Sequence, residues 1–130
     1  MMHIYCTGAG SPTIILESGA YSYSTEWYWV QRQLSTTNRV CSYDRAGNGW
    51  SEPVADPRDG LPLVRELHTL LQNANIPGPY ALAGHSLGGV LNRIYGMHYP
   101  NEVVGIVTVD SAVPQTCLDI GGYEKYKAQN

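Results

Sequence analysis

The sequence has few basic residues and no run of them. Eight Lys and Arg stand against eleven Asp and Glu, which gives a formal net charge of −3. Proteins that bind nucleic acid neutralise its phosphates with clustered Lys and Arg. We therefore expect no nucleic-acid partner.

Long hydrophobic runs are also missing. The apolar stretches "TIILE" and "VVGIVTV" stop far short of the roughly 20 residues that a membrane-spanning helix needs. The N-terminal stretch "MMHIYCTGAG" has neither the basic nor the apolar segment of a secretory signal. We expect no membrane span, and a cytoplasmic location is favoured.

Cysteine is scarce, and its pattern is uninformative for metal binding. The chain holds Cys6, Cys41 and Cys117, an odd number without CxxC spacing. Such residues are typically buried and behave as small hydrophobes. We expect all three to be reduced, with neither a disulfide nor a metal site.

The remaining composition is that of one folded domain with a real core. The chain has 130 residues, of which 43% are hydrophobic, and this is the commonest size of a domain. Strand-like runs alternate with helical apolar periodicity, which predicts an α/β fold: a three-layer, mainly parallel sheet with flanking helices. The predicted strands are 13–17, 39–44, 80–84 and 102–110, and the predicted helices are 25–34, 63–74 and 86–98. We expect the core in residues 1–111, and the start of a lid or a truncated tail in 112–130.

The stretch "GHSLG", Gly84 to Gly88, matches the pattern G-x-S-x-G between a predicted strand and a predicted helix. Such a tight turn strains the backbone of the serine, and glycines two residues before and after it prevent a collision. The helix N-terminus supplies N–H groups where an oxyanion would develop. The pattern predicts that Ser86 is a nucleophile. The alternative is a helix N-cap serine in a glycine-rich turn.

Three stretches in order resemble one family. "PTIILESGA", "CSYDRAGNGWSEP" and "ALAGHSLGGVLNRIYGMHYPNEVVGIVTVDS" are similar to the N-terminal half of the α/β-hydrolase-fold serine hydrolases, in the branch of esterases, lipases and prolyl-aminopeptidase-like enzymes. The resemblance implies a partial core with about five of the family's eight strands, in the spatial order second, fourth, third, fifth, sixth.

The resemblance also implies roles for single residues around the serine. Ser86 would be the nucleophile, and the backbone N–H groups of Leu87 and Ala20 would form the oxyanion hole. Gly19, Gly84, His85 and Gly88 would shape the turns on either side of it.

A loop of the pattern D-x-x-G-x-G-x-S would form the floor of the site, beginning with Asp44 and Arg45. Neighbouring strands would allow Glu17 and Arg45 to pair. The alternative is that both side chains are solvated at the surface.

A serine nucleophile needs a general base, and in this fold an acid and then a histidine follow the serine in the chain. The four histidines are His3, His68, His85 and His98. Three precede Ser86, and the last lies roughly 18 Å along the predicted helix at 1.5 Å per residue. None is therefore a credible base. Asp110 ends the last predicted strand, where a minority of the family place the acid, and otherwise it caps a turn.

The expected function is that of a serine-nucleophile hydrolase that acts on ester or related acyl bonds of small molecules through an acyl-enzyme. No metal or organic cofactor is expected. The base, and the acid unless Asp110 serves, would lie outside this chain, so the chain alone is expected to be inactive. The alternative is a non-catalytic, truncated remnant that works as a binding or partner-completed half-domain. The apolar strand 102–110 would form an edge that invites self-association.

Overall fold

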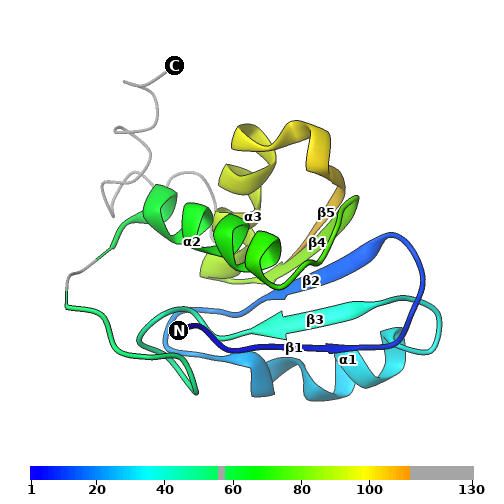
Figure 1. Ribbon diagram of the computed structural model, residues 1–130, viewed down its shortest axis with the longest axis horizontal. Coiled ribbons are helices and arrows are strands. Elements are labelled where there is room, and N and C mark those ends of the chain that lie inside the picture. The colour runs from blue at the N-terminus through cyan, green and yellow to red at the C-terminus, as the bar shows by residue number, and fades with distance from the viewer. Residues whose placement is uncertain (56–57, 112–130) are drawn as a thin grey trace.

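The computed structural model describes residues 1–55 and 58–111, which form a five-stranded sheet with helices on both faces (Figure 1). The strands are β1 (Ile4–Thr7), β2 (Thr13–Glu17), β3 (Val40–Tyr43), β4 (Tyr80–His85) and β5 (Val103–Val109). The α-helices are α1 (Tyr28–Leu34), α2 (Gly60–Asn73) and α3 (Leu87–His98), and the 3-10 helices are η1 (Ser24–Trp27) and η2 (Pro100–Glu102).

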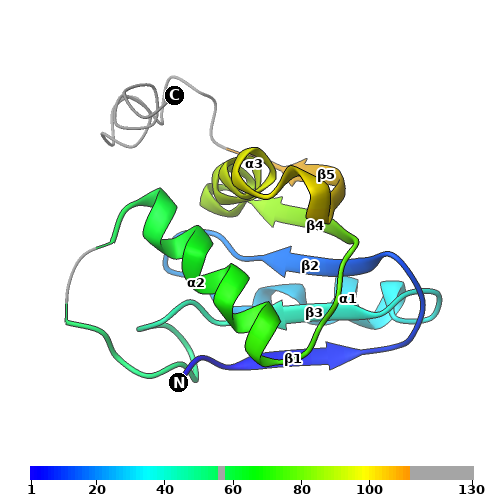
Figure 2. The same cartoon turned by 45° about the horizontal axis from the view of Figure 1, so that its top comes forward.

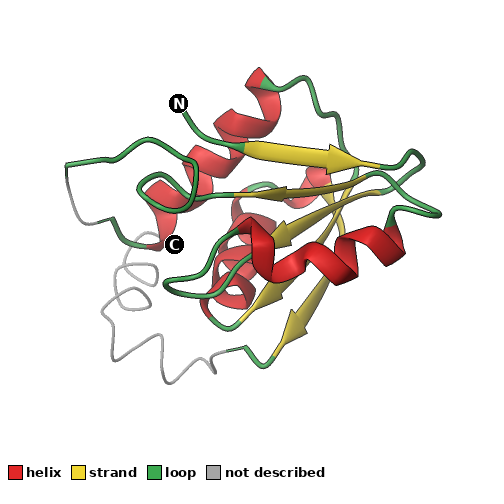
Figure 3. Ribbon diagram, turned by 90° about the horizontal axis from the view of Figure 1, so that it is seen from below, coloured by secondary structure: helices red, strands yellow, loops and turns green. Residues whose placement is uncertain are grey.

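The strands lie in the order β1-β3-β2-β4-β5. All neighbouring pairs are parallel except β1 with β3, which is antiparallel. Helices α2 and α3 cover one face of the sheet and α1 covers the other (Figures 2 and 3). The prediction of a three-layer, mainly parallel sheet is confirmed, and so is the strand order that the resemblance implied.

The core follows from alternation along the central strands. Ile15 faces α2 and α3, where it joins a buried cluster with Leu71 and Leu82, whereas Leu16 faces α1 and packs with Trp27. Helix α2 buries the stripe that its periodicity predicted, which includes Val64, Leu67 and Leu71. Both faces of the sheet are therefore apolar, as expected for parallel strands covered on two sides.

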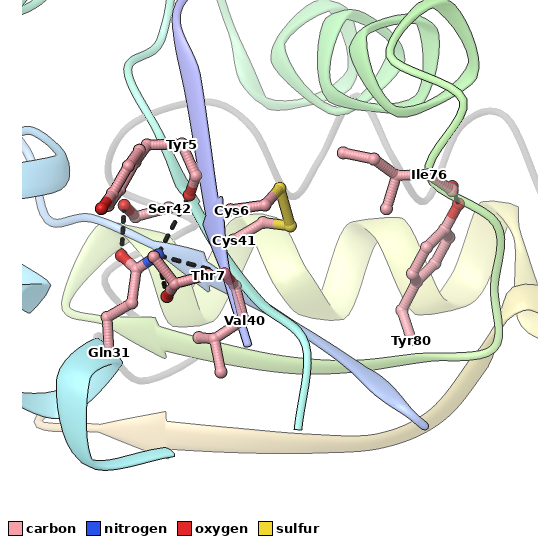
Figure 4. Close-up of a disulfide and its surroundings, with 9 residues drawn as sticks. All are labelled: Tyr5, Cys6, Thr7, Gln31, Val40, Cys41, Ser42, Ile76 and Tyr80. Carbon is pink, nitrogen blue, oxygen red and sulfur yellow. Dashed lines mark hydrogen bonds between the residues drawn. A yellow bond between two sulfur atoms is a disulfide. The ribbon is translucent and has the colours of Figure 1, made fainter. Parts of the chain in front are cut away.

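The first predicted helix differs from its prediction. Its first turn is the 3-10 helix η1, and Val30, which fitted the apolar spacing, is 42% exposed. Gln31 is buried instead, and its amide donates to the carbonyls of Tyr5 (3.0 Å) and Val40 (3.1 Å) and accepts from the Ser42 hydroxyl (2.7 Å) (Figure 4). Apolar periodicity misses this contact because the residue that joins α1 to β1 and β3 is polar.

The expectation of reduced cysteines is wrong for Cys6 and Cys41, which form a disulfide between β1 and β3 (Figure 4). The two residues stand opposite each other in the antiparallel register, with their Cα atoms 4.0 Å apart. They are 35 positions apart in the chain, so no short motif announces the pair. Cys117 lies outside the described residues.

Strand β5 forms one edge of the sheet and exposes much of its apolar surface. Val104 and Val107 are each 61% exposed, and Ile106 is 38% exposed. The predicted apolar edge is therefore present. The predicted lid start or tail, 112–130, lies outside the described residues. Among the helices of the described ranges, none combines the length and the apolar character needed to cross a bilayer.

Candidate active site

Ser86 is the single residue between the end of β4 at His85 and the start of α3 at Leu87. Its backbone has φ 51° and ψ −118°, a conformation that L residues rarely adopt and that costs on the order of 1–3 kcal/mol. Its N–H donates to the Val109 carbonyl at 3.1 Å and its carbonyl accepts from the Gly89 N–H at 3.1 Å. The predicted strand–turn–helix geometry is therefore confirmed, with the serine at the turn.

The flanking glycines lie where two backbone segments cross. A Cβ atom on Gly84 would lie 2.5 Å from the carbonyl carbon and oxygen of Gly88. A Cβ atom on Gly88 would lie 2.3 Å from the carbonyl oxygen of Glu17, at the end of β2. These contacts confirm the predicted crowding and leave no room for a side chain at either position.

The hydroxyl of Ser86 is not used for helix capping. The residue occupies the N-cap position of α3 but makes no side-chain cap hydrogen bond. Within the described ranges, its hydroxyl has no hydrogen-bond partner. The Leu87 N–H belongs to the first turn of α3, where amides have no intrahelical acceptor.

The turn that follows β2 lies against Ser86. Glu17 and Gly84 are paired in the parallel register, and a Cβ atom on Gly19 would lie 3.6 Å from the Cβ atom of Ser86. The structure therefore brings Gly19, which precedes Ala20, next to the serine, although the two are far apart in the sequence. The role of the Ala20 N–H group in an oxyanion hole, which the resemblance implied, stays a prediction.

The predicted pair between Glu17 and Arg45 is confirmed, and the alternative of two solvated side chains is wrong. Glu17 is 1% exposed and Arg45 is 6% exposed. The second carboxylate oxygen of Glu17 accepts from the Tyr43 hydroxyl. Burial raises the pKa of Glu17 to about 7, although the Arg45 guanidinium opposes this and Glu26 adds to it.

Asp44 organises the loop that follows β3. Its buried carboxylate accepts from the backbone N–H groups of Ser24 (2.7 Å) and Trp50 (3.0 Å) and lies 3.2 Å from Nδ1 of His3. Burial alone would raise the pKa of Asp44, but these donors outweigh it and hold the pKa below its usual value. Asp44 is therefore a fixed anion that joins η1 to the loop.

Sequence reasoning missed Glu26, which lies in η1 and belongs to no motif. One oxygen of its carboxylate accepts from the Gly19 N–H at 3.1 Å, and the other pairs with Nδ1 of His85. His85, which precedes Ser86, therefore turns toward Glu26. A single carboxylate within the aromatic-rich stretch 21–29 gives no signal that could have indicated this contact.

The other candidate residues lie elsewhere. His68 stacks on Tyr99 with ring centroids 4.0 Å apart, and its Nδ1 lies 3.3 Å from Glu102. His98 ends α3. Asp110 follows β5, is exposed and has φ 44°, and its role as an acid remains a prediction. In the part of the chain that the structure describes, no three His, Cys, Asp or Glu side chains come together as a metal site.

The fold agrees with comparisons to known proteins. The sequence model of the alpha/beta hydrolase fold family matches residues 12–123. The chain therefore belongs to this family.

Among its relatives, an uncharacterized protein of Schizosaccharomyces pombe is 39% identical over 95 residues, which are 72% of this chain and 18% of that protein. An AB hydrolase superfamily protein of Gibberella zeae is 35% identical over 109 residues, which are 81% of this chain and 34% of that protein. A thermophilic esterase from Thermogutta terrifontis superposes with a TM-score of 0.80 at 21% identity, over 91% of this chain and 44% of the esterase. The chain thus spans less than half the length of these proteins, and the esterase shares its fold.

Proposed function

We propose that this chain carries the nucleophile and the oxyanion hole of a serine hydrolase that cleaves ester or related acyl bonds of small molecules. Membership in the family and the esterase-like fold support a hydrolase. The finer assignment rests on the surroundings of Ser86.

The observation that carries the proposal is the unused hydroxyl of Ser86. A serine at a helix N-cap ordinarily accepts a hydrogen bond from the first turn of the helix, which is worth about 1 kcal/mol. Ser86 makes no such bond, yet its backbone is held in a costly conformation with positive φ. A serine that has a strained backbone and makes no capping hydrogen bond is best explained as a nucleophile presented at the tip of a turn.

The chemistry would be acyl transfer. The Ser86 oxygen attacks the carbonyl carbon of the substrate and the hydroxyl proton passes to a base. The charge that develops on the carbonyl oxygen is stabilised by the N–H groups of Leu87 and Ala20. The leaving group departs as the acyl-enzyme forms, and water then releases the acid and regenerates Ser86.

The base must come from a histidine that is not among the four of this chain. In this fold the base follows the serine in the chain, whereas His3, His68 and His85 precede Ser86, and His98 lies at the far end of α3 from Ser86. We propose that a segment that adds strands beyond β5 supplies both the histidine and, unless Asp110 serves, the acid.

The exposed apolar surface of β5 favours one second candidate, a half-domain that functions without catalysis when a partner completes its sheet. The two candidates differ in their demands on Ser86. An enzyme needs the hydroxyl of Ser86, whereas a binding module needs only the fold.

The test measures the rate of labelling by a fluorophosphonate and the hydrolysis of an activated ester. It compares the chain alone, the same chain extended through the remaining strands of an α/β-hydrolase sheet, and each of these with Ser86→Ala. Ser35→Ala is the matched control, because Ser35 is a half-buried serine on another element whose hydroxyl donates to the Arg32 carbonyl.

We expect little turnover by the chain alone, since loss of a catalytic histidine costs about 10⁶ in rate in subtilisin. The extended chain should be active, and Ser86→Ala should abolish its activity while Ser35→Ala does not. An extended, folded chain that neither hydrolyses ester nor is labelled at Ser86 would rule out the enzyme and favour the half-domain.

A further inference from the structure

The two peptide units on either side of the Gly19 Cα atom, Ser18–Gly19 and Gly19–Ala20, are held by charged side chains from two other segments. On one side, Nη2 of Arg45 donates to the Gly19 carbonyl at 2.5 Å and Nη1 donates to the Ser18 carbonyl at 2.7 Å. On the other side, the Glu26 carboxylate accepts from the Gly19 N–H at 3.1 Å. Ser18 and Gly19 are buried, so their backbone groups need partners inside the protein. Here two charged side chains supply such partners.

The bond from Arg45 determines where the next N–H group points. A trans peptide unit is planar, and the C=O of one residue and the N–H of the next point in opposite directions. Arg45 and the Ser22 N–H, which lies 3.3 Å from the same oxygen, both bind the Gly19 carbonyl. The Ala20 N–H is therefore directed away from Arg45.

Arg45 is itself held in place relative to α3. Its guanidinium is buried and paired with Glu17, which also accepts from the Tyr43 hydroxyl. The backbone of Glu17 lies directly under Gly88, because a Cβ atom there would be 2.3 Å from the Glu17 carbonyl oxygen. The guanidinium and the first turn of α3 thus share one rigid support.

Glu26 makes a second connection between the turn and the serine. The same carboxylate that accepts from the Gly19 N–H pairs with Nδ1 of His85, the residue before Ser86. Its side chain is only 21% exposed and that of His85 is 37% exposed. The distance between the Gly19 backbone and Ser86 is therefore maintained by one side chain that touches both segments.

We propose that Arg45 and Glu26 are positioning residues that lock the Gly19–Ala20 peptide in the direction and at the distance from Ser86 that an oxyanion requires. The proposal rests on the function proposed above. Neither residue touches the reacting atoms, and both act through the Ala20 N–H. Their effect on rate can be large, because a displacement of about 1 Å can cost about 10²-fold.

The direct readout is the order of the Ala20 amide, measured by ¹⁵N relaxation on the 130-residue chain. We expect an order parameter near 0.85 in the unaltered chain, which is typical of rigid backbone, and a value below about 0.6 in Arg45→Met and in Glu26→Ala. Glu26→Gln keeps an oxygen that can accept from the Gly19 N–H, so it should keep the Ala20 amide ordered.

Arg58→Met is the matched control. Arg58 also pairs with a glutamate, Glu66, and donates to a backbone carbonyl, that of Ala46, at 2.6 Å. Neither of these bonds reaches the turn after β2, so its removal should leave the Ala20 amide as ordered as before.

A second readout is the rate at which a fluorophosphonate labels Ser86 in the chain extended through the remaining strands of the sheet. We expect Arg45→Met and Glu26→Ala to slow labelling by about 10- to 100-fold, and Arg58→Met to leave it unchanged. Slow labelling that accompanies a mobile Ala20 amide supports the positioning role of Arg45 and Glu26. The loss of a similar Arg–Glu pair elsewhere, in Arg58→Met, should change neither the labelling rate nor the order of the Ala20 amide.

An Ala20 amide that stays as ordered in Arg45→Met and Glu26→Ala as in the unaltered chain would overturn the proposal. If Arg45→Met does not fold, the pair Glu26→Ala and Glu26→Gln decides it, since Glu26 lies near the surface. Failure of the extended chain to be labelled at Ser86 would count against the proposed function, whereas the relaxation data would still judge the two positioning residues.

Discussion

A single added methyl group tests the crossing of β4 and α3 on which the site depends. In Gly84→Ala the new Cβ atom would lie 2.5 Å from the carbonyl carbon and oxygen of Gly88 and 2.6 Å from the nitrogen of Gly89. Ordinary van der Waals contact begins at 3.4 Å. Because all three atoms belong to the backbone, the start of α3 must shift by about 1 Å, which is the kind of overpacking that typically costs about 1–3 kcal/mol.

One smaller effect opposes this cost. Alanine restricts the unfolded chain and would by itself stabilise the fold by about 0.4–1 kcal/mol. The net loss should still be about 1–2 kcal/mol, a sizeable part of the roughly 5–15 kcal/mol that stabilises a typical domain. In the extended chain, the displaced turn should also slow fluorophosphonate labelling of Ser86.

The assay is unfolding in urea, followed for Gly84→Ala and for Gly105→Ala. Gly105 lies in β5, and a Cβ atom there would have nothing within 4 Å. The control should therefore be unchanged or more stable by about 0.5–1 kcal/mol, since glycine in a strand is unfavourable. If Gly84→Ala unfolds within about 0.5 kcal/mol of the unaltered chain, β4 and α3 do not approach as closely as described and the reasoning fails.

Three further predictions concern other parts of the molecule. Glu17 is protonated more readily in the folded than in the unfolded chain, with its pKa raised from 4.5 to about 7. Its contribution to stability, up to about 3 kcal/mol, is present below pH 4.5 and is lost as the pH rises toward 7. Urea unfolding at several pH values should show this loss in the unaltered chain and not in Glu17→Gln. Cys6→Ser should cost about 2–4 kcal/mol in the free energy of unfolding, because the disulfide closes a long loop, and the difference should vanish in a thiol reductant. Val107→Lys, on the exposed edge strand, should reduce self-association in analytical ultracentrifugation, and an equal sedimentation profile for both chains would contradict that role of β5.

Local pattern predicted most of the secondary structure and the serine turn. The unbroken apolar run before Ser18 and the periodic stripe on α2 indicate a strand and a helix because burial repeats with the period of each element. The glycines at 84 and 88 indicate a crossing because no larger residue fits there, and the structure bears this out. These signals lie within a few residues of one another, so the sequence alone reveals them.

The strand order followed from the resemblance to a family. Nothing in the apolar runs by themselves says that the third strand lies between the first and the second.

What the sequence by itself determined is therefore the set of elements and the position of Ser86 between β4 and α3. Only the tertiary structure decided that Cys6 meets Cys41, that Gln31 is buried and that Glu26 joins Gly19 to His85. Each of these contacts pairs residues distant in the chain or polar residues without a motif. Their partners are fixed by the register of strands and the packing of α1 and η1 on the sheet, and that register is set by the burial of many apolar side chains together.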